Sequence, residues 1–529
     1  MTDSTRFIHH SRAHTSPART TGHAVVRRLV LLSLLFLLSL AVVGAQPSGL
    51  RILPTAGTTT SIEQYGITWY FDSEVEYGQF VNGDYWVVGP VTVTDVDPAP
   101  RRNSNGRYVH GSQINPTGQQ ARDSSGSQFN ESLRVSFPVT LDPSSNPISL
   151  VSSVSRNPDG SVSSGSPVGE LAVLTVLDMI PASGTFRPTM IGDYKPLFNW
   201  SDVESNWMRL DANSLPLPSG QSAPDSFGFA NNLERPWTLH GGSWSAEQSY
   251  PMSNMPDYHG NISQLLANAA TSMLVRDADW NDPGERERLV RNYIQVGIEY
   301  WGMQTNNAGT PRANYWLPST FAGLMLGEDN MLNLFADGLN KTEYHEPILK
   351  WYGEMDNVGR GTQTDRPSGR FPESSRTGVT LGRWIAEGTT YTDDPNGSRY
   401  GVISGGEQDT WTGYYERTGR RPVFYDSHWE HLSPRENNPG ASAAYKRMHS
   451  RPVTGFGFVA LALGIDDKIG NDRYMPYVDR WMYETEDGPI YDSYGENLQG
   501  YWWASSNNAF VDAMWREYRA SFDPSPPGS

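Results

Sequence analysis

The hydrophobic period of the chain changes near residue 261, and this change constrains the fold class most strongly. Before it, segments such as 91–96 and 133–137 alternate apolar and polar residues, and Gly, Asn, Pro and Ser separate the segments. After it, apolar residues recur every three or four positions, as in 262–274 and 290–301. The sequence therefore predicts a multi-domain α+β protein in which strands precede helices.

The strand-forming half carries one clear turn signal. Asn82 and Gly83 lie between two aromatic segments, a pattern typical of a β-hairpin. We expect residues 46–182 to form an antiparallel β-sandwich domain. Residues 183–260 are rich in Pro, Gly, Ser and Trp and have no sustained period, which predicts an irregular connecting segment. Long irregular segments in compact proteins are often functional.

Two helical segments resemble each other. Residues 321–329 and 458–466 match at Phe, two Leu, Gly and Asp, and each predicts a helix of small residues that ends at a C-cap glycine. Asp282 followed by Pro283 predicts the start of another helix. Small residues allow neighbouring helices to approach closely, as an (α/α) toroid requires. We therefore expect a toroid-like helical domain over 261–529, with an irregular bundle as the alternative.

The N-terminal segment has the features of a secretory signal. Arg27 and Arg28 precede an apolar run over 29–43, and small residues follow it. The run is shorter than the roughly 20 residues that a membrane-spanning helix needs. We therefore expect a signal peptide over 1–45 and a secreted or periplasmic chain with no membrane partner after cleavage. An uncleaved membrane anchor is the alternative.

Composition and charge exclude several classes of function. The chain has no cysteine, which excludes disulfides, thiol nucleophiles and thiolate metal sites. Its formal charge is −17, and removing a leader with five Arg and one Asp, a net +4, lowers this to −21. Such an acidic chain is a poor partner for nucleic acid. Phosphate-loop, dinucleotide and His-Glu-x-x-His motifs are absent from the sequence, so we expect no cofactor.

One pair of histidines could bind a metal. His428 and His431 have a spacing that places both imidazoles on one face of a helix, with Asp426 and Glu430 nearby. A third ligand is not identifiable in the sequence, and the segment has the composition of a loop. We therefore predict no metal site and interpret His428 or His431 as a candidate general base.

Aromatic residues suggest the class of ligand. The chain has 17 Trp and 26 Tyr, many in polar loops rich in Gly and Asn. Such side chains stack on the apolar faces of sugar rings, although they also serve as core residues. A β-domain followed by a helical toroid, in an exported and aromatic-rich chain, resembles secreted polysaccharide lyases and glycoside hydrolases built on (α/α) toroids. The resemblance implies an anionic polysaccharide as substrate and β-elimination next to a uronic carboxylate as the reaction.

Elimination needs a base for the C5 proton, an acid for the leaving oxygen, and groups that neutralise the uronic carboxylate. The catalytic candidates are His345 or His428 as the base, Tyr445 or Tyr258 as the acid, and Arg312 or Arg451 on the carboxylate. The candidates for substrate binding are Asn306, Asn307, Tyr315, Trp316, Trp411 and His259. The loops before residues 321 and 458 occupy equivalent positions in the repeat, so we expect them to face one cavity.

Two other functions fit the same composition. An inverting glycoside hydrolase needs two carboxylates roughly 6.5–9.5 Å apart, and Glu407, Asp409 and Asp426 are the candidates. The acidic balance of the chain favours this alternative. A non-catalytic glycan-binding protein needs only exposed aromatic rings. The reaction products distinguish the three functions, because elimination leaves an unsaturated sugar and hydrolysis leaves a reducing sugar.

Overall fold

A computed structural model gives the architecture of the unit Ile52–Ser529. The residues that it describes are 57–104, 106, 108–117, 134–144, 146–155, 168–235, 259–306, 316–335, 442–469, 474–475, 478, 482 and 506–522. The predicted signal peptide over 1–45 lies outside the described residues. Within the described part of the chain, the helices are too short or too polar to cross a bilayer.

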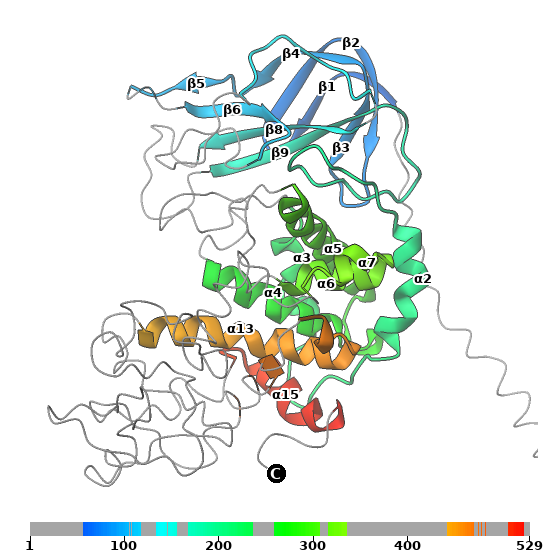
Figure 1. The fold of residues 1–529 in the computed structure, drawn as a ribbon, viewed down its shortest axis with the longest axis vertical. Coiled ribbons are helices and arrows are strands. Elements are labelled where there is room, and N and C mark those ends of the chain that lie inside the picture. The colour runs from blue at the N-terminus through cyan, green and yellow to red at the C-terminus, as the bar shows by residue number, and fades with distance from the viewer. Residues whose placement is uncertain are drawn as a thin grey trace, which may run out of the picture. The chain divides into compact units, whose positions relative to one another are not determined.

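All the described strands join one sheet (Figure 1). Its strands are β1 (Gly57–Gln64), β2 (Ile67–Gln79), β3 (Tyr85–Val88), β4 (Val91–Asp97), β5 (Arg101–Arg102), β6 (Tyr108–Ile114), β7 (Val139–Leu141), β8 (Ile148–Ser155) and β9 (Val168–Leu177). The strand order is β5-β6-β8-β9-β3-β2-β4-β7, and β1 pairs with β2. The sheet is mixed, because β3 pairs with β9 in parallel and the other pairs are antiparallel.

The prediction of an antiparallel β-sandwich is wrong. The structure has a single curled sheet of nine strands, shaped like half a barrel, where a sandwich has two facing sheets. Strand β9 shows why the sequence pattern was ambiguous. Leu171 and Val173 pack into a core shared with the helices, while Ala172, Leu174 and Val176 pack into the core that the curled sheet encloses. A curled sheet with helices on its outer face therefore buries alternating residues much as a sandwich does.

The predicted hairpin is confirmed. Strands β2 and β3 pair antiparallel, with Tyr77 opposite Val87, and Gly83 in the turn adopts a φ of 90°. The positive φ explains the glycine at this position. The turn also carries a buried carboxylate, because the Asn82 amide donates a 2.8 Å hydrogen bond to Oδ2 of Asp84. The hairpin thus presents Asp84 at the end of the sheet.

Helices follow the strands, as the change of period predicts, but they begin at Trp200, within the segment over 183–260 that was predicted to be irregular. Its α-helices are α2 (Trp200–Asp211), α3 (Phe229–Asn232), α4 (His259–Met273), α5 (Pro283–Thr305), α6 (Trp316–Leu326), α7 (Asp329–Leu332), α13 (Ser442–Leu463) and α15 (Ala509–Phe522). Short 3₁₀ turns η2 (Pro224–Phe227), η4 (Asp277–Asp279) and η8 (Asp466–Ile469) lie between them. The predicted start of α5 is confirmed, because the Asp282 side chain accepts a 2.9 Å hydrogen bond from the Gly284 amide.

Both members of the sequence repeat end as predicted. Gly327 follows α6 with a φ of 71°, and Gly464 follows α13 with a φ of 64°. The amide after each glycine bonds back to the last turn, from Glu328 to the Gly323 carbonyl and from Ile465 to the Ala460 carbonyl. This is the hydrogen bond of a Schellman motif, which satisfies carbonyls that the helix leaves free.

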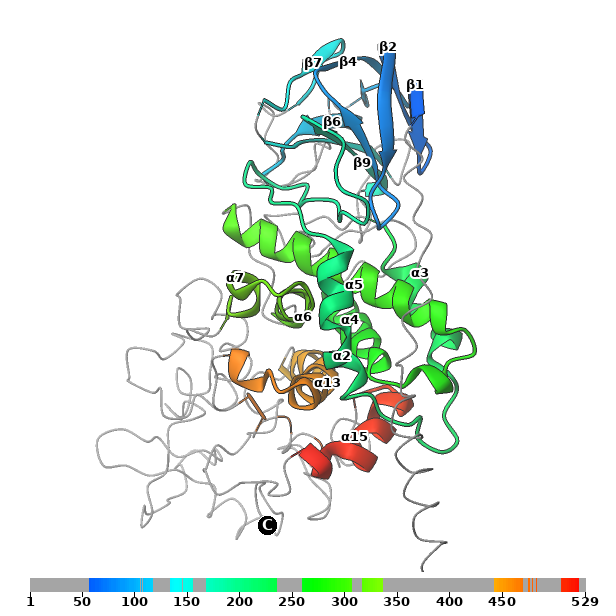
Figure 2. The same cartoon turned by 90° about the vertical axis from the view of Figure 1, so that its right-hand side faces the viewer.

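The prediction of a toroid is not supported. Helix α4 packs mainly on α13, which lies far from it in the sequence, and α5 packs mainly on α6 (Figure 2). The closest contacts are therefore made within pairs of helices. The small residues of the helices allow the paired helices to approach closely. A Cβ at Gly455 would lie 2.8 Å from the Ala267 carbonyl oxygen, and one at Gly297 would overlap the Pro318 carbonyl oxygen. Small residues therefore indicated close helix contacts correctly, but such contacts do not require a ring of helices.

Replacing Gly297 by Ala tests the contact between α5 and α6. The added methyl group would meet backbone of α6, which cannot yield as a side chain does, so we expect the free energy of unfolding to fall by about 1–3 kcal/mol. Gly457→Ala in α13 is the matched control, because its Cβ would meet the flexible Met475 side chain at 3.1 Å. Equal stability of both variants in urea unfolding would contradict the prediction.

Candidate functional site

The structure describes the side chains of few predicted site residues. Those of Asn306, Trp316 and Arg451 are described. His259 begins α4 and Tyr445 lies within α13, but their side chains are outside the description. His345, His428, His431, Tyr258, Arg312, Asn307, Tyr315, Trp411, Glu407, Asp409 and Asp426 lie outside the described residues. The shared cavity expected between the two loops of the repeat therefore stays a prediction.

Trp316 lies in the helical core. It is the first residue of α6 and is fully buried. Its ring lies edge-on to Phe456 of α13 at 6.4 Å between centroids and to Tyr474 at 5.8 Å. In this arrangement the ring has no face open to a sugar, and it fixes the start of α6 against α13.

Arg451 lies in α13, where it is partly buried. It precedes Pro452, which the helix contains in its interior. Trp316 packs on the same helix through Phe456. Asn306 belongs to a different part of the molecule.

Asn306 caps the C-terminal end of α5 and holds the connecting segment. Its Oδ1 accepts a 2.9 Å hydrogen bond from the Tyr194 amide, and its Nδ2 donates to the Tyr194 carbonyl at 3.2 Å. The Tyr194 ring lies 5.7 Å from the Trp301 ring, yet 56% of the residue is exposed. The Asn306 side chain therefore holds the exposed Tyr194 through both the N–H and the carbonyl group of the tyrosine backbone.

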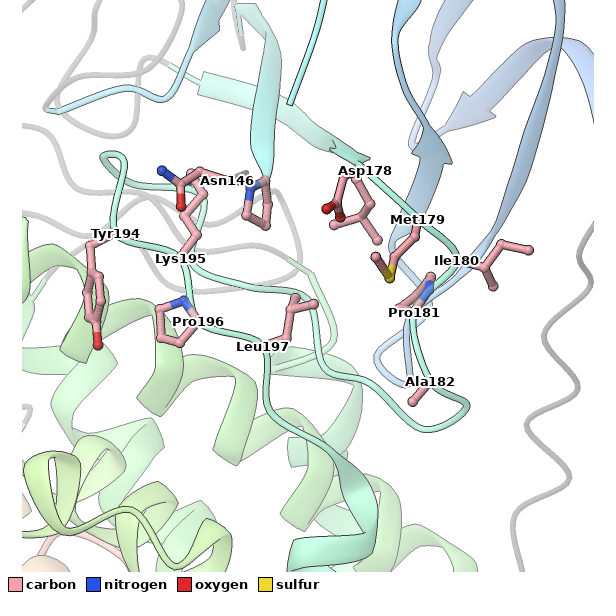
Figure 3. Close-up of a pocket in the computed structure, with 12 residues that line it drawn as sticks. Asn146, Asp178, Met179, Ile180, Pro181, Ala182, Tyr194, Lys195, Pro196 and Leu197 are labelled. Carbon is pink, nitrogen blue, oxygen red and sulfur yellow. The ribbon is translucent and has the colours of Figure 1, made fainter. Parts of the chain in front are cut away.

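Tyr194 lies on the wall of a pocket of about 490 Å³ between the sheet and the helices (Figure 3). Its lining residues are Asn146, Pro147, Leu177, Asp178, Met179, Ile180, Pro181, Ala182, Tyr194, Lys195, Pro196 and Leu197. They come from the two residues before β8, the end of β9 and two loops of the segment that follows. The volume lies within the range of small-molecule sites.

The pocket also collects exposed apolar side chains. Six large hydrophobic residues of the described part of the chain are strongly exposed, and Met179, Ile180, Tyr194 and Leu197 among them line this pocket. Scattered exposed apolar residues are ordinary, but a group of them around a concavity marks an interaction site. This clustering makes the pocket the leading candidate site in the described structure.

Lys195 is the buried polar group of the pocket. Its Nζ donates hydrogen bonds to Ser149 Oγ at 3.0 Å and to the Thr189 carbonyl at 2.6 Å. Only 4% of the residue is exposed. Asp178 and Asn146, which also line the pocket, are exposed.

A buried set of charges acts on Lys195. Arg187 is fully buried, with Nε 2.5 Å from Oδ2 of Asp84 and a terminal nitrogen 2.6 Å from Oε1 of Glu299. Asp84 belongs to the hairpin of the sheet, and Glu299 belongs to α5. Glu299 also accepts from the Met190 amide at 3.1 Å. With Lys195 protonated, two cations balance two carboxylates in this charge cluster.

Burial lowers the pKa of Lys195 to about 7. The negative charges of Glu299 and Asp193 oppose this shift, and the positive charge of Arg187 adds to it. The ammonium and amine forms are therefore both populated near neutral pH, unlike those of an ordinary lysine.

The sequence reasoning missed Tyr194, Lys195 and the charge cluster. A usable signal was present, because Arg187 and Lys195 are cations within a stretch rich in Pro, Gly, apolar and aromatic residues. Charged residues in such surroundings are seldom buried without partners. Within the described residues, groups of three or more His, Asp or Glu that could hold a metal ion are absent.

The Lys195 pKa predicts a pH dependence of stability. The folded state binds fewer protons at this site than the unfolded chain between pH 7 and about 10, so the contribution of Lys195 to the free energy of unfolding rises with pH. Relative to Lys195→Met, we expect the native protein to gain about 2 kcal/mol between pH 7 and pH 9.

Urea unfolding at the two pH values measures this gain. Lys468→Met, at a partly exposed lysine paired with Asp467, is the control for the loss of a lysine elsewhere. An identical pH dependence in the native protein and in Lys195→Met would contradict the lowered pKa.

Comparisons of this chain with models of protein families, with curated proteins and with solved structures found no match. These comparisons therefore indicate neither a substrate nor a catalytic residue. The contacts, burial and charge of the described residues are the basis for a functional assignment.

Proposed function

We propose that this protein acts outside the cytoplasm on a uronic-acid-containing polysaccharide, which it binds at the pocket beside Tyr194 and cleaves by β-elimination. The observation that carries the proposal is the exposed ring of Tyr194 on the wall of a pocket of about 490 Å³. The signal-like leader and the abundance of Trp and Tyr support an extracellular glycan as the ligand.

The wall of the pocket suits a sugar ring. The Tyr194 ring and the neighbouring Pro196 and Leu197 offer apolar surface to the C–H face of a sugar. Asn146 and Asp178 offer hydrogen-bonding groups for its hydroxyl edge. Binding sites for small ligands combine these two kinds of surface, with a few polar groups setting the orientation.

Tyr194 is held in a way that favours binding. Both backbone groups of Tyr194 bond to the Asn306 side chain, and its ring packs against Trp301. A ring that is already ordered loses little conformational entropy when it contacts a ligand. The same exposed tyrosine on a free loop would contribute less to affinity.

We assign the pocket to substrate binding and place the elimination chemistry elsewhere. Asp178 is the one carboxylate among the described lining residues, and Arg451, the catalytic candidate whose side chain is described, is not one of them. Arg451 lies in α13 and is partly buried. Its role in the proposal is to neutralise the uronic carboxylate, so that a base can remove the adjacent C5 proton.

Replacing Tyr194 by Ala should weaken binding of the polysaccharide. Loss of one stacking ring costs about 1–3 kcal/mol, which corresponds to a rise in Kd of roughly fivefold to 150-fold. Isothermal titration calorimetry with oligosaccharides of the substrate measures the change. Tyr70→Ala is the matched control, because Tyr70 is also exposed but lies on β2 and does not line the pocket. Equal losses in both variants would remove the assignment of the pocket.

Elimination has its own readout. We expect the purified chain, incubated with alginate, glucuronan, pectate, ulvan and glycosaminoglycans, to raise the ultraviolet absorbance of one of them, because the product is an unsaturated sugar. Arg451→Ala and Tyr445→Phe should each lower the rate by about 10² to 10⁴. Arg276→Ala, at an exposed arginine paired with Asp279, is the control.

The other possible results have clear meanings. New reducing ends without absorbance would replace elimination by hydrolysis. Binding that depends on Tyr194 without any cleavage would leave a glycan-binding protein. Unchanged rates in both the Arg451 and Tyr445 variants would remove these residues from the reaction.

A further inference from the structure

We propose that Lys195 is the residue that makes the pocket selective for an acidic sugar, by pairing its Nζ with the carboxylate of the bound unit. The proposal rests on the proposed function, since it concerns the same pocket, and it names the group of the substrate that the pocket recognises. Two observations carry it: Lys195 lines the pocket, and its nitrogen has spare capacity to donate.

The hydrogen bonding of Lys195 leaves one donor for a ligand. A protonated lysine has three N–H groups. Among the described residues, two of them have acceptors, Ser149 Oγ and the Thr189 carbonyl oxygen. A ligand oxygen that reaches Nζ from the pocket would accept the third hydrogen bond. The two existing bonds also hold the nitrogen in place, so the site needs little rearrangement.

The surrounding charges make a carboxylate a better partner than a hydroxyl. Arg187 already pairs with Asp84 and Glu299. Its positive charge repels the ammonium form of Lys195. Glu299 and Asp193 attract Lys195, but the two hydrogen bonds of its Nζ go to neutral acceptors. A buried ammonium with two neutral acceptors gains most from an anion, because charge-assisted hydrogen bonds are about twice as strong as neutral ones.

Two carboxylates limit which anion can enter. Asp178 lies in the lining of the pocket, and Asp193 adjoins Tyr194, where it accepts a 2.8 Å hydrogen bond from Asn115. Both would repel a phosphate monoester, which carries nearly two negative charges at neutral pH, more strongly than a single carboxylate. The pocket therefore suits one monoanionic sugar unit with apolar faces.

Binding of such a unit must also take up a proton above neutral pH. The carboxylate pairs with the ammonium form of Lys195, while burial keeps much of the free protein in the amine form there. At pH 6 the ammonium form is already present and the uptake should be small. At pH 8 the uptake should approach one proton for each bound sugar unit.

Isothermal titration calorimetry of the full chain tests the inference. The probes are tetrasaccharides of glucuronic, galacturonic, mannuronic and guluronic acid, each compared with the neutral sugar in which a hydroxymethyl group replaces the carboxylate. Each titration is run at pH 6 and pH 8 in two buffers of different ionisation enthalpy, which gives the number of protons taken up. For the acidic sugar that binds, we expect close to one proton at pH 8 and an affinity that falls about tenfold from pH 8 to pH 9.

A variant separates Lys195 from the rest of the pocket. Lys195→Met keeps the length of the side chain and removes the charge, so it should bind the acidic and the neutral sugar equally and take up no proton. Lys468→Met should behave as the native protein does. Proton uptake in the native protein needs no variant, so the inference remains testable if Lys195→Met does not fold.

The outcomes distinguish this inference from the proposed function. Equal binding of acidic and neutral sugars by the native protein, still lost in Tyr194→Ala, would overturn the role of Lys195 and keep the sugar pocket. Acidic selectivity without proton uptake at pH 8 would also overturn it. Failure of every sugar to bind would overturn both proposals.

Discussion

The ion pairs of Arg187 fix the two halves of the protein to each other. One side of its buried guanidinium contacts Asp84 of the β-hairpin, and the other contacts Glu299 of α5. Losing one partner of a buried pair leaves an uncompensated charge at a cost of about 3–5 kcal/mol, so the contact strongly opposes any separation of sheet and helices. Tyr194 and Lys195 follow Arg187 in the same segment, so the ion pairs of Arg187 also hold the wall of the pocket in place.

Strand β9 shows that the two halves also share one core. Its alternate residues face the enclosed core of the sheet and the core of the helices, so the strand belongs to both. The charge cluster also joins the two halves, through Asp84 of the hairpin and Glu299 of α5. Hydrogen bonds from Thr189 and Met190 to the Glu299 carboxylate, and from Gln295 to the Arg187 carbonyl, add to the ion pairs of this cluster. Apolar and ionic contacts thus join the sheet to the helices at the same place.

Local features of the sequence were predicted well, and long-range features were not. The Asn82-Gly83 turn, the Asp282 cap and the terminal glycines of α6 and α13 depend on neighbouring residues, so the chain itself specifies them. The parallel pairing of β3 with β9 joins residues almost ninety positions apart, and alternation cannot reveal it. The site was missed for the same reason. Asp84, Arg187 and Glu299 meet only in space, and Trp316 satisfies equally the patterns of a core residue and of a sugar platform.

The bond between Asn306 and the backbone of Tyr194 has a consequence for how this protein can evolve. Helix α5 spans 23 residues between its cap at Asp282 and Asn306 at its end. Each residue added to or removed from a helix turns its end by about 100° and moves it by about 1.5 Å. A single insertion or deletion within α5 would therefore swing Asn306 away from the loop and release the tyrosine. The number of residues in α5, as well as their identity, must be inherited unchanged for the pocket to keep its shape.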